Sequence, residues 1–228
     1  MELLYQGKTK DIYQGLNQSM ILKFKDDVTG TDGKFDPGAN QIGLSIEGMG
    51  NLNLRLTTLF FQLLNQSGIP THFIDSNLNE NTMTVKSASV FGKGLEVITR
   101  FKATGSFIRR YGEYIEDGAK LNNYVEFTLK DDKRQDPLVT KDGLITLNIL
   151  TNKQYEILID LNIQIAQIIQ KKLAEHGFDL YDIKLEFGYV NHPDNIILID
   201  EISGGNMRVY KEGQLVDPIE LAQYFNDL

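Results

Sequence analysis

Two short stretches late in the chain place ionisable side chains inside segments that have the pattern of buried strands. The first, DIKLEFGYV, puts Asp182, Lys184 and Glu186 at alternate positions. The second, IILIDEISGG, places Asp200 and Glu201 directly after an aliphatic run. Burying a charge is costly unless the charge is paired or binds a metal. These stretches are therefore the first candidates for a site that binds ions.

The alternation predicts how these charges meet. Successive side chains of a strand point to opposite faces of a sheet, so the three charged residues of the first stretch share one face. If the intervening GYVNHPDN turns the chain back, the strands pair antiparallel and Glu186 lies opposite or near Asp200. Facing carboxylates repel, and a bound Mg²⁺, which prefers a few carboxylates together with substrate phosphates, would remove the repulsion. Lys184 could contact the same phosphates. Alternatively, Lys184 pairs with one acid and the other acid lies at an exposed edge.

A second candidate lies near the N-terminus. The stretch YQGKTKDIY places Gly7, Lys8 and Lys10 between two expected strands. Backbone N–H groups of a glycine turn, together with lysine ammonium groups, can bind phosphates. The spacing is not that of a P-loop, and an ordinary hairpin turn is the alternative interpretation.

The composition narrows the class of protein. The chain has 228 residues, 41% hydrophobic and 24% charged, which fits one large domain or two small ones. A net charge of -8 argues against a general nucleic-acid coat. No apolar run approaches the roughly 20 residues that span a membrane, and the N-terminus lacks the pattern of a signal peptide. Without cysteine there is no thiolate metal site or cysteine nucleophile. A cytoplasmic location is the simplest expectation.

A local excess of positive charge interrupts this acidic chain. Between residues 93 and 110 a single acid, Glu96, is accompanied by basic side chains. These are Lys93, Arg100, Lys102, Arg109 and Arg110. A basic segment in an acidic protein indicates a small anionic ligand, and a solvated charged face is the alternative.

The expected elements follow an α+β pattern, with strands first and mixed elements afterwards. Strands are expected at residues 3–7, 10–15, 20–25, 71–75, 82–90, 95–103 and 121–130. Residues 26–43 and 131–140 are polar or glycine-rich and are expected to be loops, and helices are expected at 50–68, 105–112 and 218–225. Ser106 is the expected cap of the second of these. Residues 157–165 alternate like a strand, but the length of the segment 151–176, with Thr151 or Asn152 as N-cap and Gly177 as terminator, favours a helix.

Five motifs, in this order along the chain, together resemble the SAICAR synthetase family. They are YQGKTKDIY, LEVITRFKATGSFIRRYG, LKDDKRQDPLV, YDIKLEFG and LIDEISGGNMRVY. The resemblance implies a two-lobed, ATP-grasp-like α+β fold with antiparallel sheets and flanking helices. It also implies an N-terminal nucleotide-binding lobe over residues 1–95 and a C-terminal lobe with the metal and substrate site over 96–228, without a clear linker.

The resemblance also implies roles for individual residues. The residues matched to ATP binding are Gly7, Lys8, Lys10, Lys86, Glu96, Val97, Lys184 and Glu186, with the backbone of Glu96 and Val97 expected at the adenine. Glu186 and Asp200 match metal ligands. The residues matched to the ribotide substrate are Arg100, Ser106, Arg110 and Arg208. Lys184 and Asp32 match catalytic positions, Asp32 as an acid near the substrate.

The implied reaction joins carboxyaminoimidazole ribotide to L-aspartate with ATP and Mg²⁺, through an acyl phosphate, and a homo-oligomer is possible. Three departures from the family pattern lie on the substrate side. Gly204 and Gly205 replace a proline and an aspartate, Met49 replaces a lysine, and ELAQYFNDL lacks the arginines that end the family pattern, as in a C-terminally shortened branch. They leave open a paralogue that uses another amine or carboxylate. A nucleotide-binding regulator without turnover is the third possibility. A kinase would rest on fold analogy alone, and the H-R-D signature is missing.

Overall fold

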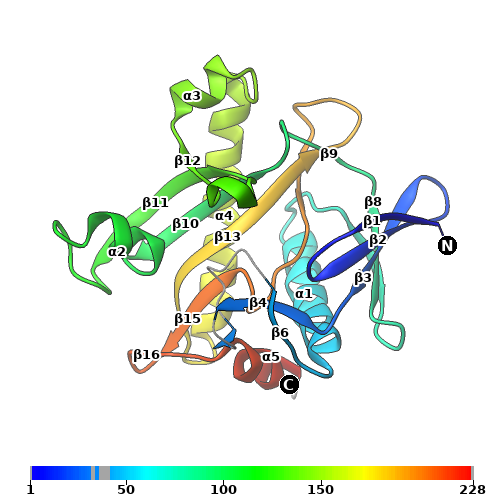
Figure 1. The fold of residues 1–228 in the computed structure, drawn as a ribbon, viewed down its shortest axis with the longest axis horizontal. Coiled ribbons are helices and arrows are strands. Elements are labelled where there is room, and N and C mark those ends of the chain that lie inside the picture. Colours follow the sequence, from blue (N-terminus) through cyan, green and yellow to red (C-terminus); the bar gives the residue numbers. More distant parts are fainter. Residues whose placement is uncertain (1, 32–33, 36–41, 227–228) are drawn as a thin grey trace. The chain divides into compact units, whose positions relative to one another are not determined.

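The structure, a computed structural model, describes residues 2–31, 34–35 and 42–226 and divides the chain into two compact units (Figure 1). Unit 1 comprises Met1–Ala88, Glu201–Asn206 and Asp217–Leu228, and unit 2 comprises Ser89–Asp200 and Met207–Val216. This division differs from the expected lobes chiefly because the chain returns twice to unit 1 near its end. In the described part of the chain, no helix is long and apolar enough to cross a membrane.

Unit 1 contains an antiparallel sheet in the order β1-β2-β3-β8-β7. Its strands are β1 (Leu3–Gln6), β2 (Lys10–Gln14), β3 (Ser19–Phe24), β8 (Thr82–Lys86) and β7 (Phe73–Asn77), which confirms the strands expected there. A second, small sheet is formed by β4 (Asp27–Thr31), β5 (Lys34–Phe35) and β6 (Ile42–Ser45). The expectation of a loop throughout residues 26–43 was therefore wrong. Glycine makes this pairing possible, since a Cβ at Gly43 would lie 2.6 Å from the Cα of Gly30 across the ladder.

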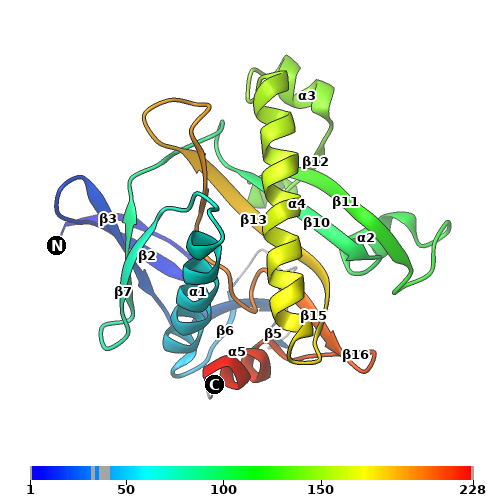
Figure 2. The ribbon, with the colours of Figure 1, turned by 180° about the vertical axis from the view of Figure 1, so that it is seen from behind.

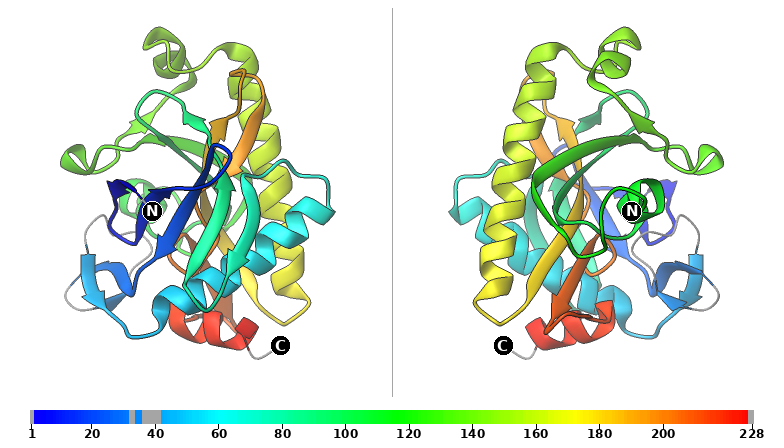
Figure 3. Two further views of the ribbon diagram at one scale, coloured as in Figure 1. Left: turned by 90° about the vertical axis from the view of Figure 1, so that its right-hand side faces the viewer. Right: turned by 90° about the vertical axis from the view of Figure 1, so that its left-hand side faces the viewer.

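Two helices of unit 1, α1 (Met49–Gln66) and α5 (Pro218–Asn226), lie side by side (Figure 3). Phe60 of α1 meets Phe225 of α5 with 6.1 Å between ring centroids. The Asp26 carboxylate accepts hydrogen bonds from the backbone N–H groups of Gly48 and Gly50 and so satisfies donors at the start of α1. The helix predicted for residues 50–68 is thereby confirmed.

Unit 2 is built on a larger sheet in the order β12-β11-β10-β13-β15-β16, with β14 and β9 also paired to β13. The strands are β9 (Ser89–Val90), β10 (Leu95–Lys102), β11 (Lys120–Leu129), β12 (Leu138–Val139), β13 (Asp179–Tyr189), β14 (Ile196–Ile199), β15 (Met207–Lys211) and β16 (Gln214–Leu215). The central strand β13 is antiparallel to β14, as the turn between the two charged stretches predicted.

One face of this sheet is covered by α4 (Asn152–Ala174), which crosses β10, β11 and β13 in the view from behind (Figure 2). Ile183, Leu185 and Phe187 of β13 are buried, and the Asn162 amide of α4 donates a hydrogen bond to Thr99 of β10. Thr151 caps α4 in a capping box with Gln154. The helical interpretation of residues 151–176 is confirmed and the strand alternative excluded.

Three short helices complete unit 2: α2 (Ser106–Tyr111), the 3-10 helix η1 (Asp132–Arg134) and α3 (Lys141–Thr146). Two expectations failed here. Residues 131–140 contain η1 and β12, and the residue that precedes α2 is Gly105, without a side-chain cap. Ser106 is the first residue of the helix and not its N-cap, and its hydroxyl accepts a hydrogen bond from Arg100.

Candidate functional site

The face of the unit 2 sheet opposite to α4 carries charges on three adjacent strands. Along the β10–β13 ladder, Glu96 pairs with Glu186, Ile98 with Lys184, and Arg100 with Asp182. On the other side of β10, Ile98 pairs with Glu126 of β11. Because paired residues of a ladder point to the same face, these side chains meet. We call this surface the charged face.

One end of the charged face holds a complete ion-pair network around Arg100. Its Nε and Nη2 donate to Oε1 of Glu126, at 3.0 and 2.5 Å. Its Nη1 donates to a carboxylate oxygen of Asp182 and, at 3.4 Å, to the Thr104 carbonyl, while Nη2 also donates to Oγ of Ser106 at 2.8 Å. Arg100 is only 1% exposed. All five guanidinium N–H donors thus have acceptors inside the protein, and Arg100 can touch a substrate only by exchanging one of them.

Two further arginines bind the same carboxylates. Nη2 of Arg110 donates to both oxygens of Glu126 at 2.7 Å, and Nη1 of Arg208 donates to both oxygens of Asp182 at 2.9 and 3.2 Å. The Arg208 guanidinium lies against the backbone of Gly105, where a Cβ would come within 2.6 Å of its Cζ. The arginine cluster is therefore Arg100, Arg110 and Arg208 with Glu126 and Asp182. The three guanidinium groups outnumber the two carboxylates, so the cluster keeps a net positive charge that would attract a bound anion.

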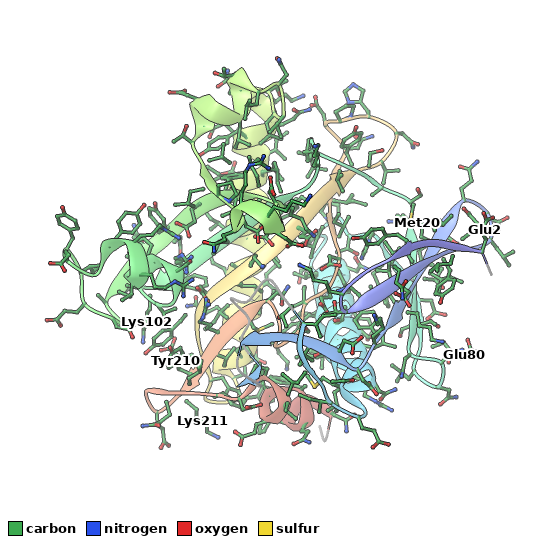
Figure 4. The ribbon with its side chains drawn as sticks, viewed as in Figure 1. Glu2, Met20, Glu80, Lys102, Tyr210 and Lys211 are labelled. Atoms are coloured by element: carbon green, nitrogen blue, oxygen red, sulfur yellow. The ribbon has the colours of Figure 1, made fainter. Side chains whose placement is uncertain are left out.

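The arginine cluster ends at a packed aromatic boundary. Lys102 and Tyr210 lie at this end of the sheet (Figure 4). The Lys102 ammonium is 2.5 Å from a carboxylate oxygen of Asp179 and 4.5 Å from the centre of the Tyr181 ring. That ring stacks on Tyr210, with centroids 3.6 Å apart. The hydrogen bond with Asp179 raises the pKa of Lys102, so this lysine remains charged.

The other end of the charged face brings carboxylates together. Glu186 pairs with Ile199 in the β13–β14 ladder, which places Asp200 one residue beyond. Burial, and next the negative charge of Asp200, raise the pKa of Glu186 to about 7. Nζ of Lys130 lies 2.6 Å from Oε1 of Glu186. Burial would lower the pKa of Lys130, but the charges of Glu186 and Asp200 outweigh it and raise that pKa. We call Glu186 and Asp200 the carboxylate pair.

Glu96 and Lys184 lie between these two ends. Oε1 of Glu96 accepts a hydrogen bond from the Lys184 ammonium at 2.8 Å, and Oε2 accepts one from the Thr128 hydroxyl at 2.8 Å. The backbone of Glu96 and Val97 lies between β11 and β13 and pairs with both neighbours. This geometry does not support the predicted adenine contact, because both edges of the strand are occupied. What the structure shows for Glu96 is that its side-chain carboxylate pairs with the ammonium of Lys184.

The donor set of the carboxylate pair fits a hard divalent cation. It offers carboxylate oxygens only, and burial followed by the negative charge of Asp200 raises the pKa of Glu186. In the described residues no group of three or more His, Cys, Asp or Glu side chains gathers as a ready-made metal site. A cation held here would need further oxygens from substrate phosphates or water, as Mg²⁺ does.

The predicted phosphate-binding residues of the hairpin β1–β2 belong to unit 1. The N–H of Gly7 donates to the Lys10 carbonyl at 2.9 Å, and a Cβ at position 7 would lie 2.3 Å from that oxygen, so the turn requires glycine. Nζ of Lys10 lies 2.6 Å from Oε1 of Glu201; the lysine is buried and the glutamate largely so. Lys8 is half-buried in the same turn. Lys86, at the end of β8, donates to the Thr71 carbonyl at 3.1 Å.

One predicted catalytic residue, Asp32, lies outside the described residues. The other, Lys184, is placed on the charged face with its predicted neighbour Glu186. The structure brings the predicted ribotide residues Arg100, Ser106, Arg110 and Arg208 into contact through the arginine cluster.

Sequence reasoning missed three acids and one lysine that these residues depend on. They are Glu126, Asp182, Glu201 and Lys130. Asp182 and Glu201 carried a signal, since both stand in the charged stretches, but no partner could be named for either. Glu126 and Lys130 are, respectively, a single acid inside the β11 pattern and the residue just after that strand. Only the register of β11 against β10 shows what they meet.

Two of the departures from the family pattern have a packing explanation within unit 1. A Cβ at Gly204 would lie 2.6 Å from the Cβ of Pro218, the first residue of α5. The glycine is therefore required by the close approach of this helix. Met49, the first residue of α1, is fully buried in the core of the unit, a position where the ammonium of a lysine would be costly.

The chain can now be compared with known proteins. The sequence profile described as SAICAR synthetase matches residues 3–220. The chain belongs to the SAICAR synthetase family. A phosphoribosylaminoimidazole-succinocarboxamide synthase of Clostridium tetani is 55% identical over 97% of this chain and 97% of that protein. The enzyme of the same name from Bacillus cereus (strain B4264) is 39% identical over 93% of this chain and 84% of that protein.

Solved structures of the family share the fold. The crystal structure of the synthase from Ehrlichia chaffeensis superposes with a TM-score of 0.85 at 29% identity, covering 99% of this chain and 93% of that one. A SAICAR synthetase in complex with ADP superposes with a TM-score of 0.83 at 30% identity, covering 98% of this chain and 91% of that one. The predicted α+β fold of SAICAR synthetase type is confirmed.

Proposed function

We propose that the protein joins carboxyaminoimidazole ribotide to L-aspartate, with ATP, to give SAICAR, ADP and phosphate in purine biosynthesis. Membership of the family and the 55% identity to a named synthase support this activity. The ADP complex of a related structure supports the nucleotide. The observation that carries the proposal is the charged face, which brings a carboxylate pair, a lysine and an arginine cluster together on one side of the unit 2 sheet.

The reaction has two steps. The ribotide carboxylate attacks the γ-phosphorus of ATP, and the bond to the β,γ-bridging oxygen breaks to release ADP and leave an acyl phosphate. The amine of aspartate then attacks the acyl carbon, phosphate leaves with the bonding electrons, and the nitrogen loses a proton. Phosphoryl transfer needs positioning and neutralisation of charge more than a covalent nucleophile, which suits a chain without cysteine.

We assign the residues of the chain to these needs. Mg²⁺, when held by Glu186 and Asp200, would supply positive charge to the phosphates. The hydrogen bond to Glu96 orients the ammonium of Lys184, which would add a further positive charge during transfer. In unit 1, Lys8 and Lys10 with the backbone of Gly7 are proposed phosphate contacts, and Lys86 is a proposed contact of the nucleotide.

The arginine cluster is proposed to bind the 5-phosphate of the ribotide. Arg110 and Arg208 each bind a carboxylate through a single nitrogen, and within the described residues their remaining N–H groups make no hydrogen bond. Arginine presents such donors in a fork that matches phosphate. Arg100, whose donors are all used, would hold Glu126, Asp182 and Ser106 in place. Asp32 remains a proposed orienting acid for the amine.

A coupled assay of ADP release tests the activity. Purified protein, Mg-ATP and carboxyaminoimidazole ribotide are incubated with and without L-aspartate, and the product is followed by mass. We expect ADP release that depends on aspartate and a product with the mass of SAICAR. ADP release only with another amine or acid would identify a paralogue, and tight Mg-ATP binding without any turnover would identify a nucleotide-binding regulator.

A further inference from the structure

Lys130 stands in the motif LKDDKRQDPLV, but neither that motif nor the proposed reaction has given it a role on the charged face. It directly follows β11, and its ammonium lies 2.6 Å from Oε1 of Glu186. The ammonium thus occupies one member of the carboxylate pair, which is the place where the proposed function requires a divalent cation.

The backbone is arranged to let Lys130 reach this position. Gly94 has a φ of +112°, and a Cβ there would lie 2.9 Å from Cδ of Lys130. The Lys130 N–H also donates to the Gly94 carbonyl at 3.2 Å. The side chain of Lys130 therefore passes over a residue without a side chain on its way to Glu186. Any other residue at position 94 would obstruct this path and would strain the backbone.

The ion pair is also built so that it can open. The Lys130 side chain is 42% exposed, whereas Glu186 is 18% exposed. The ammonium can therefore withdraw into water by rotation of its own stem, while the carboxylate stays in the sheet. A partly exposed ion pair of this kind contributes little net free energy to stability. A cation that binds Glu186 more strongly can therefore displace the ammonium at a small cost in free energy.

We propose that the Lys130 ammonium is the resident counter-cation of Glu186 in the carboxylate pair: it neutralises this carboxylate in the metal-free protein and must leave before a divalent cation binds there. This inference rests on the proposed function, because that function places the cation at this pair. Its consequence is that the free protein binds divalent metal weakly. The negative charge of a nucleotide shifts the balance, because its phosphates attract both the cation and the released ammonium.

Binding of Mn²⁺ to the nucleotide-free protein tests the inference without any turnover. Titration calorimetry or electron paramagnetic resonance would measure the affinity in wild type and in Lys130→Met, which keeps the stem and removes the charge. We expect Mn²⁺ to bind Lys130→Met about fivefold more tightly than wild type. Lys133→Met, three residues further on in η1, is the matched control and should bind as wild type does. Equal or weaker binding by Lys130→Met would overturn the inference.

Two further measurements keep the result decisive. Glu186→Gln should abolish Mn²⁺ binding at this site. If it does while Lys130→Met leaves the affinity unchanged, the inference fails and the metal site of the proposed function stands. If Glu186→Gln leaves binding unchanged, the metal assignment itself fails, and the inference with it. Should Lys130→Met not fold, the ¹⁵N signal of the Lys130 ammonium in wild type, assigned with Lys130→Arg, takes its place. Loss of its hydrogen bond on addition of Mg²⁺ is expected, and a retained bond contradicts the inference.

Discussion

The two ends of the charged face treat their charges in opposite ways. In the arginine cluster, Arg100 is buried and every donor has an acceptor, so the carboxylates of Glu126 and Asp182 are neutralised by the fold itself. In the carboxylate pair, Glu186 keeps a raised pKa although Lys130 is 2.6 Å away. One end of the charged face, which we call the finished end, thus has its buried charges fully paired within the protein. The other, the unfinished end, keeps a carboxylate whose pKa stays raised beside a lysine. The carboxylate pair is therefore the end at which a bound cation would neutralise charge, whereas the charges of Arg100, Glu126 and Asp182 are already paired within the protein.

The largest expected effect breaks the finished end. Arg100→Ala should lower the free energy of unfolding by about 3–5 kcal/mol, because Glu126 and Asp182 would lose their buried partner. Urea denaturation measures this change. Arg109→Ala, an exposed arginine of the same short helix α2, should stay within about 0.5 kcal/mol of wild type. In the folded fraction, use of the ribotide should suffer more than ATP binding. Equal losses of both would show that the arginine cluster does not serve the ribotide.

The next effect concerns the unfinished end. Asp200→Asn should lower kcat at least about 100-fold, because the pair would lose half of its negative charge toward the cation. The steady-state ADP-release assay measures it, and thermal unfolding checks the fold. Asp194→Asn, in the turn between β13 and β14, is the matched control. Full activity in a folded Asp200→Asn variant would remove the metal from the proposed site.

A smaller effect is expected in unit 1, where Glu201 fixes the ammonium of Lys10 at 2.6 Å. Glu201→Gln should weaken ADP binding about tenfold if Lys10 contacts phosphate, because the lysine loses the partner that orients it. Fluorescence titration with a labelled nucleotide measures the affinity. Glu220→Gln on the exposed side of α5 is the control. Unchanged binding in Glu201→Gln would assign the Lys10–Glu201 pair to stability alone.

The smallest effect is a pH dependence of stability. The folded-state pKa of Glu186, about 7, lies above its ordinary value of 4.5. Its contribution to stability is therefore complete below about pH 4.5 and is lost as the pH rises through 7. Relative to Glu186→Gln, the free energy of unfolding of the wild type should fall across this interval and change little above it. Urea denaturation at several pH values measures the difference. If the free energy of unfolding of the wild type instead rises relative to that of Glu186→Gln as the pH increases, Lys130 fully neutralises Glu186.

The two ends of the charged face also differ in how much of their structure could be predicted from the sequence. Alternation along β13 and the turn before β14 were enough to predict that Glu186 and Asp200 lie together, because both are local features. The partners of Arg100 were beyond reach, since Glu126 and Asp182 meet it only through the registers of β11 and β13 against β10, and the β10–β11 ladder carries an irregularity next to Arg100. Gly204 looked like a change on the substrate side until its contact with Pro218 was seen.

The position of β13 in the chain has a consequence for how the protein is made. Lys184 meets Glu96 across 88 residues of sequence, and Asp182 meets Arg100 across 82. A growing chain that ends before Asp179 already contains β10 and β11 but none of the β13 groups that their charges require. Such long-range pairings form slowly and leave intermediates exposed to aggregation. The folding of unit 1 is delayed further, because this unit includes two segments that are synthesised later. They are Glu201–Asn206 and Asp217–Leu228. We therefore expect neither unit to mature before these late segments have been synthesised, which makes residues 179–228 the region most sensitive to truncation and the most dependent on chaperones.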